Sequence, residues 1–304
     1  MEAQTRNYVA TSCITVLAYD IVLYFDEEVI YIWRSLWSIP KLLYVFCRYY
    51  PLIHLCVTLT FGTHQISQHV CQEYWWYYGF GGYVLIVPII SLIFFFRVWA
   101  LYGNSWQMNA LLSLMFLGEF VSEIVTTIHV TIPDARNAVS DSLTSNGLPG
   151  CDTKIWLDPH FNTFQTLAWV PFLANGGLLF LFMLFKLWTP LQKRRADREQ
   201  VHYFELKSPI LSSMFKDGIL YFFIVFASGA LLMLKDLIPS MNVFGGYFHL
   251  WFIVILSLSG ARLILNLRRI ATVEHSSGTS TPAFTTFAAR NPNIESIATT
   301  SSSV

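Results

Sequence analysis

The sequence predicts an all-α fold, a polytopic membrane bundle of seven transmembrane helices. Hydrophobic residues make up 54% of the 304-residue chain and charged residues only 12%, against roughly 25% in a soluble domain. Seven apolar segments are each long enough to cross a hydrocarbon layer of about 30 Å as a helix. Lys and Arg gather in alternate connectors between these segments.

The predicted helices divide the chain into a seven-helix domain, residues 1–268, and a tail, residues 269–304. They cover about 8–25, 38–60, 79–101, 109–132, 162–188, 217–238 and 243–266. Prolines and charges interrupt the second, but neighbouring helices can satisfy the backbone groups that proline frees. The tail is rich in Ser and Thr and has little to bury, so we expect it to be disordered.

The distribution of basic residues predicts the orientation. Four lie in connectors of one side: Arg6, Arg136, Lys154 and Lys235. Thirteen lie in connectors of the other side and in the tail: Arg34, Lys41, Arg97, Lys186, Lys193, Arg194, Arg195, Arg198, Lys207, Lys216, Arg268, Arg269 and Arg290. The side richer in Lys and Arg is expected to be cytoplasmic. The N-terminus is then outside and the C-terminus cytoplasmic, which is a receptor-like topology.

Two outer connectors contain one cysteine each. Cys71 stands just before the third segment, near the aromatic run 75–78, which is typical of a membrane interface. Cys151 stands in the long loop between the fourth and fifth segments. Because both lie on the predicted outer side, we favour a disulfide over two free thiols, although sequence alone does not place them within bonding distance.

Two charges lie inside the first two apolar segments. Asp20 and Arg48 fall at similar depth when these helices run antiparallel, so we predict an ion pair between them. The favoured role is to lock the two helices together, and the alternative is a switching or transport role. The acidic connector that follows Asp20 is expected to lie at the cytoplasmic interface.

Two carboxylates share one face of the fourth helix. Glu119 and Glu123 are four residues apart, which would suit proton relay or cation binding. The favoured interpretation is plainer: Glu119 hydrogen-bonds a neighbouring helix and Glu123 approaches the outer surface. Near the cytoplasmic ends of other helices, Arg97 and Arg262 are expected to reach the headgroups by snorkelling, with a gated cytoplasmic cavity as the alternative.

The motifs of common enzymes are missing from this sequence. It contains no H-x-x-x-H, H-E-x-x-H, G-x-S-x-G, C-x-x-C or glycine-rich phosphate loop. The histidines are expected to be dispersed near the outer interface rather than to bind a metal. We therefore predict no catalytic residue, no metal site and no cofactor. A net charge of zero gives no indication of nucleic acid as a partner.

The N-terminal blocks A-Y-D-I-V-L-Y-F-D-E-E-V-I-Y-I-W-R and K-L-L-Y-V-F-C-R-Y-Y-P, at about 12–53, resemble a domain of unknown function. This domain is found in multi-pass membrane proteins of mushroom-forming fungi. F-R-V-W-A-L-Y-G, K-D-G-I-L-Y-F and S-G-A-R-L-I-L-N-L-R are similar to later segments of the same family. The resemblance implies a membrane protein without an established activity. It marks Asp20, Glu28, Trp33, Arg48, Tyr49, Pro51, Arg97, Tyr102, Asp217, Arg262 and Asn266.

The leading functional hypothesis is a seven-helix receptor or sensor in the plasma membrane rather than an internal membrane. Its partners would be the lipid bilayer, a small apolar ligand from the outer side, and a cytoplasmic protein at 189–216 and the tail. For that charged connector, attraction to anionic lipid is the plainer interpretation. A transporter or channel that uses the intramembrane carboxylates is the alternative hypothesis, and a membrane-embedded enzyme is the third.

Overall fold

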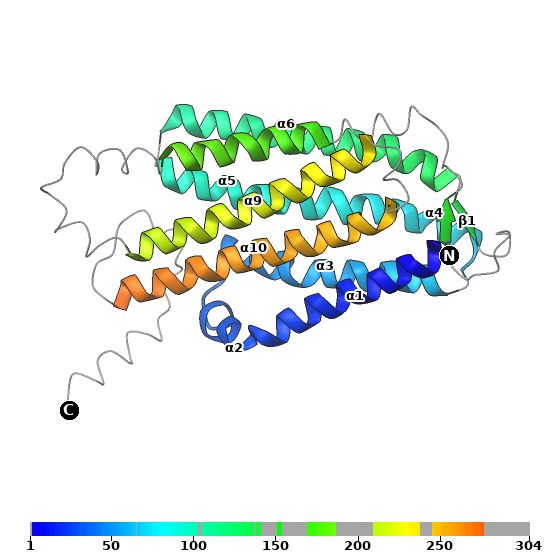
Figure 1. The fold of residues 1–304 in the computed structure, drawn as a ribbon, viewed down its shortest axis with the longest axis horizontal. Coiled ribbons are helices and arrows are strands. Elements are labelled where there is room, and N and C mark those ends of the chain that lie inside the picture. The colour runs from blue at the N-terminus through cyan, green and yellow to red at the C-terminus, as the bar shows by residue number, and fades with distance from the viewer. Residues whose placement is uncertain are drawn as a thin grey trace, which may run out of the picture.

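The computed structural model describes residues 2–64, 66–102, 105–136, 138–140, 151–153, 169–186, 209–237 and 245–276. Long helices run side by side along one axis and alternate in direction (Figure 1). A ribbon of two short strands lies at one end. The described part is therefore helical apart from this ribbon, and the predicted class is confirmed at that level.

The described elements follow one another along the chain with few breaks. They are α1 (Glu2–Leu23), α2 (Phe25–Glu28), the π-helical turn η1 (Val29–Trp33), α3 (Ile39–Thr63), α4 (Gln68–Tyr77), the π-helical segment η2 (Tyr78–Val84), α5 (Leu85–Tyr102), α6 (Trp106–Arg136), β1 (Ala138–Ser140), β2 (Cys151–Thr153), a helix over Trp169–Lys186, α9 (Pro209–Leu237) and α10 (Gly245–Ser276).

The apolar helices indicate a membrane protein. In the described ranges six helical segments are long and apolar enough to cross a membrane, and a seventh is obtained if α1 is counted with α2 and η1. The break between α1 and α2 bends that pair by 58°. The described helices thus number six or up to seven candidate spans, and the expected count of seven stays a prediction.

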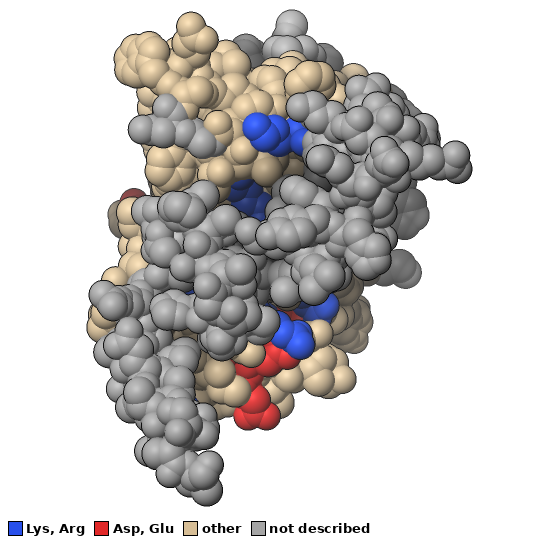
Figure 2. Space-filling view, turned by 90° about the vertical axis from the view of Figure 1, so that its left-hand side faces the viewer, with Lys and Arg blue, Asp and Glu red and all other residues tan. Residues whose placement is uncertain are grey.

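The two ends of the bundle differ in their elements. The ribbon end contains the first residues of α1 and the antiparallel pair β1–β2, in which Ser140 pairs with Cys151. The opposite end, here called the α2 end, contains α2, η1 and the last residues of α5 and α10. Figure 2 shows the α2 end, where acidic and basic atoms of described residues lie side by side.

Several helix boundaries differ from those predicted; α9, for example, begins at Pro209 rather than near residue 217. The acidic connector after the first helix is itself helical, because buried Glu28 holds it against α3. The aromatic stretch before the third segment is also helical and continuous with α5 over Gln68–Tyr102, since its rings pack on neighbours, as Tyr74 does on Phe61 with centroids 4.6 Å apart. Finally, α10 continues to Ser276, into the expected tail; the tail beyond it lies outside the described residues.

The helices are not equally buried. In the apolar window of Phe248–Arg269, 67% of residues are buried inside the bundle, against 17% for α6. Thus α10 is central and α6 peripheral. The outward face of α6 exposes Leu114, Leu117 and Val121, which suits contact with lipid chains. At the centre, a Cβ on Gly260 would stand 2.5 Å from both Cys47 Sγ and Ile90 Cδ1, so the glycine permits the close approach of α10 to α3 and α5.

Candidate functional site

The candidate site is a buried ionic network at the α2 end, and Arg48 of α3 is its centre. Arg48 forms a salt bridge with the Asp20 carboxylate on α1 and donates a second hydrogen bond to the Asp20 backbone oxygen at 2.8 Å. Its Nε donates to Glu28 Oε1 at 2.6 Å. Only 3% of the Arg48 side chain is exposed. One guanidinium therefore joins two carboxylates from two elements.

Glu28, the last residue of α2, is fully buried and well satisfied. Besides Arg48, its carboxylate accepts hydrogen bonds from the hydroxyls of Tyr44 and Tyr49, each at 2.7 Å. Tyr44 and Arg48 are four residues apart on α3, so they present their donors on one face. These contacts fix the helical elbow of α2 and η1 against α3.

Arg262 of α10 completes the network. Its Nη2 donates to Asp20 Oδ1 at 2.5 Å, and its guanidinium lies 4.7 Å from the centroid of the Tyr24 ring, within cation–π range. The Arg262 side chain is 34% exposed, so it is the least buried of the four charges. Two arginines and two carboxylates make the network neutral overall. The expectation that Arg262 only snorkels is corrected, because a buried acceptor lies within its reach.

The structure thus places Asp20 against Arg48 but adds two members that sequence reasoning missed as partners. Glu28 lies in the acidic stretch that the sequence predicts at the cytoplasmic interface, and Arg262 is far along the chain. The one signal that singles out Glu28 is its position in the N-terminal block that resembles the domain of unknown function. The alignment of Arg262 with Asp20 depends on how deeply α10 enters the bundle, which a helix pattern does not specify.

Glu119 of α6 is the centre of a second buried polar group. It accepts a hydrogen bond from Ser91 Oγ of α5 at 2.6 Å and another from Asn175 Nδ2 of the Trp169–Lys186 helix. Only 4% of Glu119 is exposed, whereas Glu123 is half-buried and its carboxylate has no hydrogen bond to a described residue. The geometry is that of a carboxylate joining three helices. Within the described ranges, no hydrogen bond links this group to Asp20 or Arg48.

Removal of the Glu119 carboxylate tests how much this contact between three helices stabilises the protein. Glu119→Leu should lower the free energy of unfolding by about 1–3 kcal/mol, because Ser91 and Asn175 lose their buried acceptor. Glu123→Leu is the matched control and should change stability by less than about 0.5 kcal/mol. Thermal unfolding of both variants in detergent provides the measurement. Equal losses in the two variants would contradict the assignment.

A third polar group lies toward the ribbon end, where four helical elements converge. Tyr83 Oη of η2 is hydrogen-bonded to His249 Nδ1 of α10, and Lys235 Nζ of α9 lies 3.3 Å from His249 Nε2. The ring of Trp169 stacks on His249 with centroids 6.1 Å apart. Lys235 and His249 are both buried. His249 is therefore part of a packed polar and aromatic cluster to which four helical elements contribute.

The remaining predicted residues are distributed as follows. Cys71 and Cys151 are joined by a disulfide with Cα atoms 5.6 Å apart, which ties α4 to β2. Arg97 Nη2 lies 3.4 Å from the Leu263 carbonyl oxygen, so α5 is bonded to α10. Tyr102 Oη donates to the Phe182 carbonyl oxygen at 2.9 Å. The side chain of Asp217 lies outside the described residues, and Asn266 is half-buried on α10.

His54 was not predicted as part of any site. It is fully buried on α3, its two ring nitrogens have no hydrogen-bond partner among the described residues, and the rings of Tyr50, Tyr77 and Tyr78 pack around it. In the described ranges no group of three or more His, Cys, Asp or Glu side chains is placed to hold a metal ion.

One comparison with known proteins concerns the ionic network directly. Residues 8–53 match the model of a family of unknown function (DUF6533). The match confirms the resemblance of the N-terminal block to such a domain family. It contains Asp20, Glu28 and Arg48, whereas Arg262 lies beyond it. No curated protein and no solved structure matches this chain.

Proposed function

We propose that the protein is a seven-helix receptor or sensor of the plasma membrane, with the ribbon end outside and the α2 end in the cytoplasm. Seven spans result when α1, α2 and η1 form one bent span. The excess of Lys and Arg supports this orientation. The disulfide supports it independently, because such bonds persist on the oxidising side of a membrane.

The observation that carries the proposal is that α10 belongs to two polar clusters. His249 contacts Tyr83 and Lys235 near the ribbon end, and Arg262 contacts Asp20 near the α2 end. The two residues are 13 positions apart on one helix, which is about 20 Å along its axis. A shift of α10 that begins at one cluster therefore reaches the other, as coupling between two sites requires.

The charges of the network suit a switch. If α10 moves, Asp20 loses Arg262 but keeps its salt bridge to the more deeply buried Arg48. Arg262 is already one-third exposed, so its guanidinium can turn toward the headgroups instead of remaining unpaired in a region of low dielectric constant. Breaking this pair is therefore cheap in free energy, whereas breaking the Arg48 pairs is costly.

The cluster around His249 is the proposed ligand site. Its members come from η2, the Trp169–Lys186 helix, α9 and α10. They combine aromatic rings with two polar groups, the Lys235 amine and the His249 imidazole. That combination suits a small, largely apolar ligand that enters from the outer side. The cytoplasmic partner would dock on 189–216 and the tail. We propose no enzymatic activity.

The experiment follows the distance between α1 and α10 at the α2 end. Spin labels are attached to Leu23→Cys and Arg269→Cys in a Cys56→Ser background, since both positions and Cys56 are exposed. The purified protein in nanodiscs is titrated with medium-chain alcohols, aldehydes and fatty acids. We expect at least one of these compound classes to shift the distance distribution saturably.

Two buried histidines provide the control. His249→Gln should abolish that shift, whereas His54→Gln, which lies outside the cluster on α3, should preserve it. A distance distribution that none of the compounds alters would contradict the sensor proposal. Ion flux in proteoliposomes with an unchanged distance would instead favour the transporter or channel hypothesis.

A further inference from the structure

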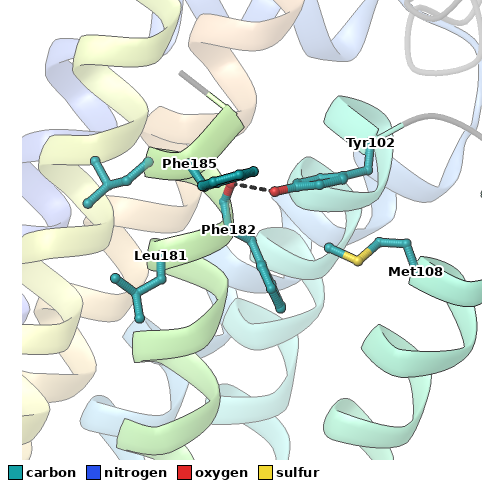
Figure 3. Close-up of a pocket in the computed structure, with 6 residues that line it drawn as sticks. Tyr102, Met108, Leu181, Phe182 and Phe185 are labelled. Atoms are coloured by element: carbon teal, nitrogen blue, oxygen red, sulfur yellow. Dashed lines mark hydrogen bonds between the residues drawn. The ribbon is translucent and has the colours of Figure 1, made fainter. Parts of the chain in front are cut away.

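An apolar cavity lies at the α2 end between α5, α6 and the Trp169–Lys186 helix (Figure 3). Its volume is about 610 Å³, within the usual range of ligand pockets. The lining consists of Tyr102, Met108, Leu181, Phe182, Leu184 and Phe185. None of these side chains is charged, so the cavity suits a hydrocarbon chain.

The only hydroxyl among these lining residues is already used. Tyr102 Oη donates to the Phe182 carbonyl oxygen, as Figure 3 shows. The ring of Tyr102, rather than its hydroxyl, is therefore available to line the cavity. Leu181 is 58% exposed and Phe185 is 70% exposed, so the cavity opens on the outer surface of the bundle. In a membrane that surface faces lipid. The occupant can therefore enter laterally from the bilayer.

A cation stands at the edge of this cavity. Lys186 ends the helix that forms one wall, and its Nζ lies 5.1 Å from the centroid of the Tyr102 ring. The end of the cavity nearest Lys186 is thus positively charged, while its lining is apolar.

From this juxtaposition we propose that the cavity binds an anionic phospholipid. One acyl chain occupies the space between Met108 and Phe182, and the phosphate lies against Lys186. The complementarity is that of an apolar groove with a single cation at its mouth, at the depth where a helix terminus meets the headgroups. This inference does not depend on the receptor proposal.

The test compares phosphatidylglycerol with phosphatidylcholine of the same acyl chains, added to the delipidated full-length protein in detergent. Native mass spectrometry measures the lipid that stays bound. We expect tighter binding of phosphatidylglycerol and a loss of about fivefold in that preference for Lys186→Gln, the contribution of one lysine near an anionic surface. Arg269→Gln is the matched control, since it removes an exposed cation from α10, which does not line the cavity.

A second variant tests the contribution of the apolar cavity to lipid binding separately from that of the Lys186 charge. Met108→Trp fills the cavity and should weaken binding of both lipids, while leaving the thermal unfolding of the protein little changed. Glycerol phosphate, the headgroup without chains, should not compete. The proposal is overturned if Lys186→Gln retains the full preference, if Met108→Trp binds both lipids normally, or if glycerol phosphate displaces phosphatidylglycerol.

Discussion

Arg48→Leu should destabilise the protein more than any other single substitution in the ionic network. Asp20 and Glu28 would keep their negative charges in a buried site and lose their shared guanidinium. Breaking a buried ion pair by removing one partner costs about 3–5 kcal/mol. We expect most of the variant to aggregate on detergent extraction, and a strong fall in the midpoint of thermal unfolding for the remainder.

Arg262→Leu is the matched control for this prediction. It removes the same functional group from the same network, but Arg262 is partly exposed and Asp20 keeps Arg48. The expected loss is about 1 kcal/mol or less, since solvent screens the pair. The loss of stability in Asp20→Asn should be closer to that in Arg48→Leu, because the substitution leaves buried Arg48 with one carboxylate. Equal stability of the two arginine variants would show that Arg48 is not the centre of the network.

Loss of the disulfide is the second large expected effect. The bond closes a loop between residues 80 positions apart, and chain entropy alone predicts a stabilisation of about 4.5 kcal/mol for a loop of this length. That value is a ceiling, because helices that remain in the membrane already restrict the unfolded chain. Cys151→Ser should therefore lower the unfolding temperature clearly, and reducing agent should do the same to the unchanged protein.

A free cysteine provides the control for that experiment. Cys56 is exposed on α3 and has no disulfide, so Cys56→Ser should leave the unfolding temperature unchanged. Reducing agent should have no further effect on Cys151→Ser. If it lowers the stability of that variant as much as that of the unchanged protein, the stabilising bond is not the one between Cys71 and Cys151.

The helical class was predictable because apolar length is a strong signal for a membrane helix. The same signal fails where a helix continues past the apolar segment. Gln68–Tyr77 reads as a polar and aromatic connector, yet it is helical, because its rings pack against neighbours and its Cys71 is tied to β2. The elbow at Phe25–Trp33 is helical for a similar reason, since tertiary contacts of Glu28 outweigh its acidic surroundings.

Part of the candidate site was predictable and part was not. Asp20 and Arg48 stand out because a charge inside an apolar segment needs a partner, and adjacent antiparallel helices bring near-matching depths together. Arg262 and Asn175 are partners from distant segments. Their register relative to Asp20 and Glu119 is set by close packing of whole helices, such as the approach that Gly260 permits, and no local pattern encodes it.

The neutrality of the ionic network has a consequence for biogenesis. When α1, α2 and α3 have left the ribosome, Asp20 and Glu28 face Arg48 alone, and the nascent hairpin holds one excess negative charge among these residues. The balancing charge, Arg262, arrives only with α10, the final described helix. Docking of α10 therefore brings the net charge of the network to zero. A chain truncated before α10 lacks Arg262, so two carboxylates of the network then share the single guanidinium of Arg48.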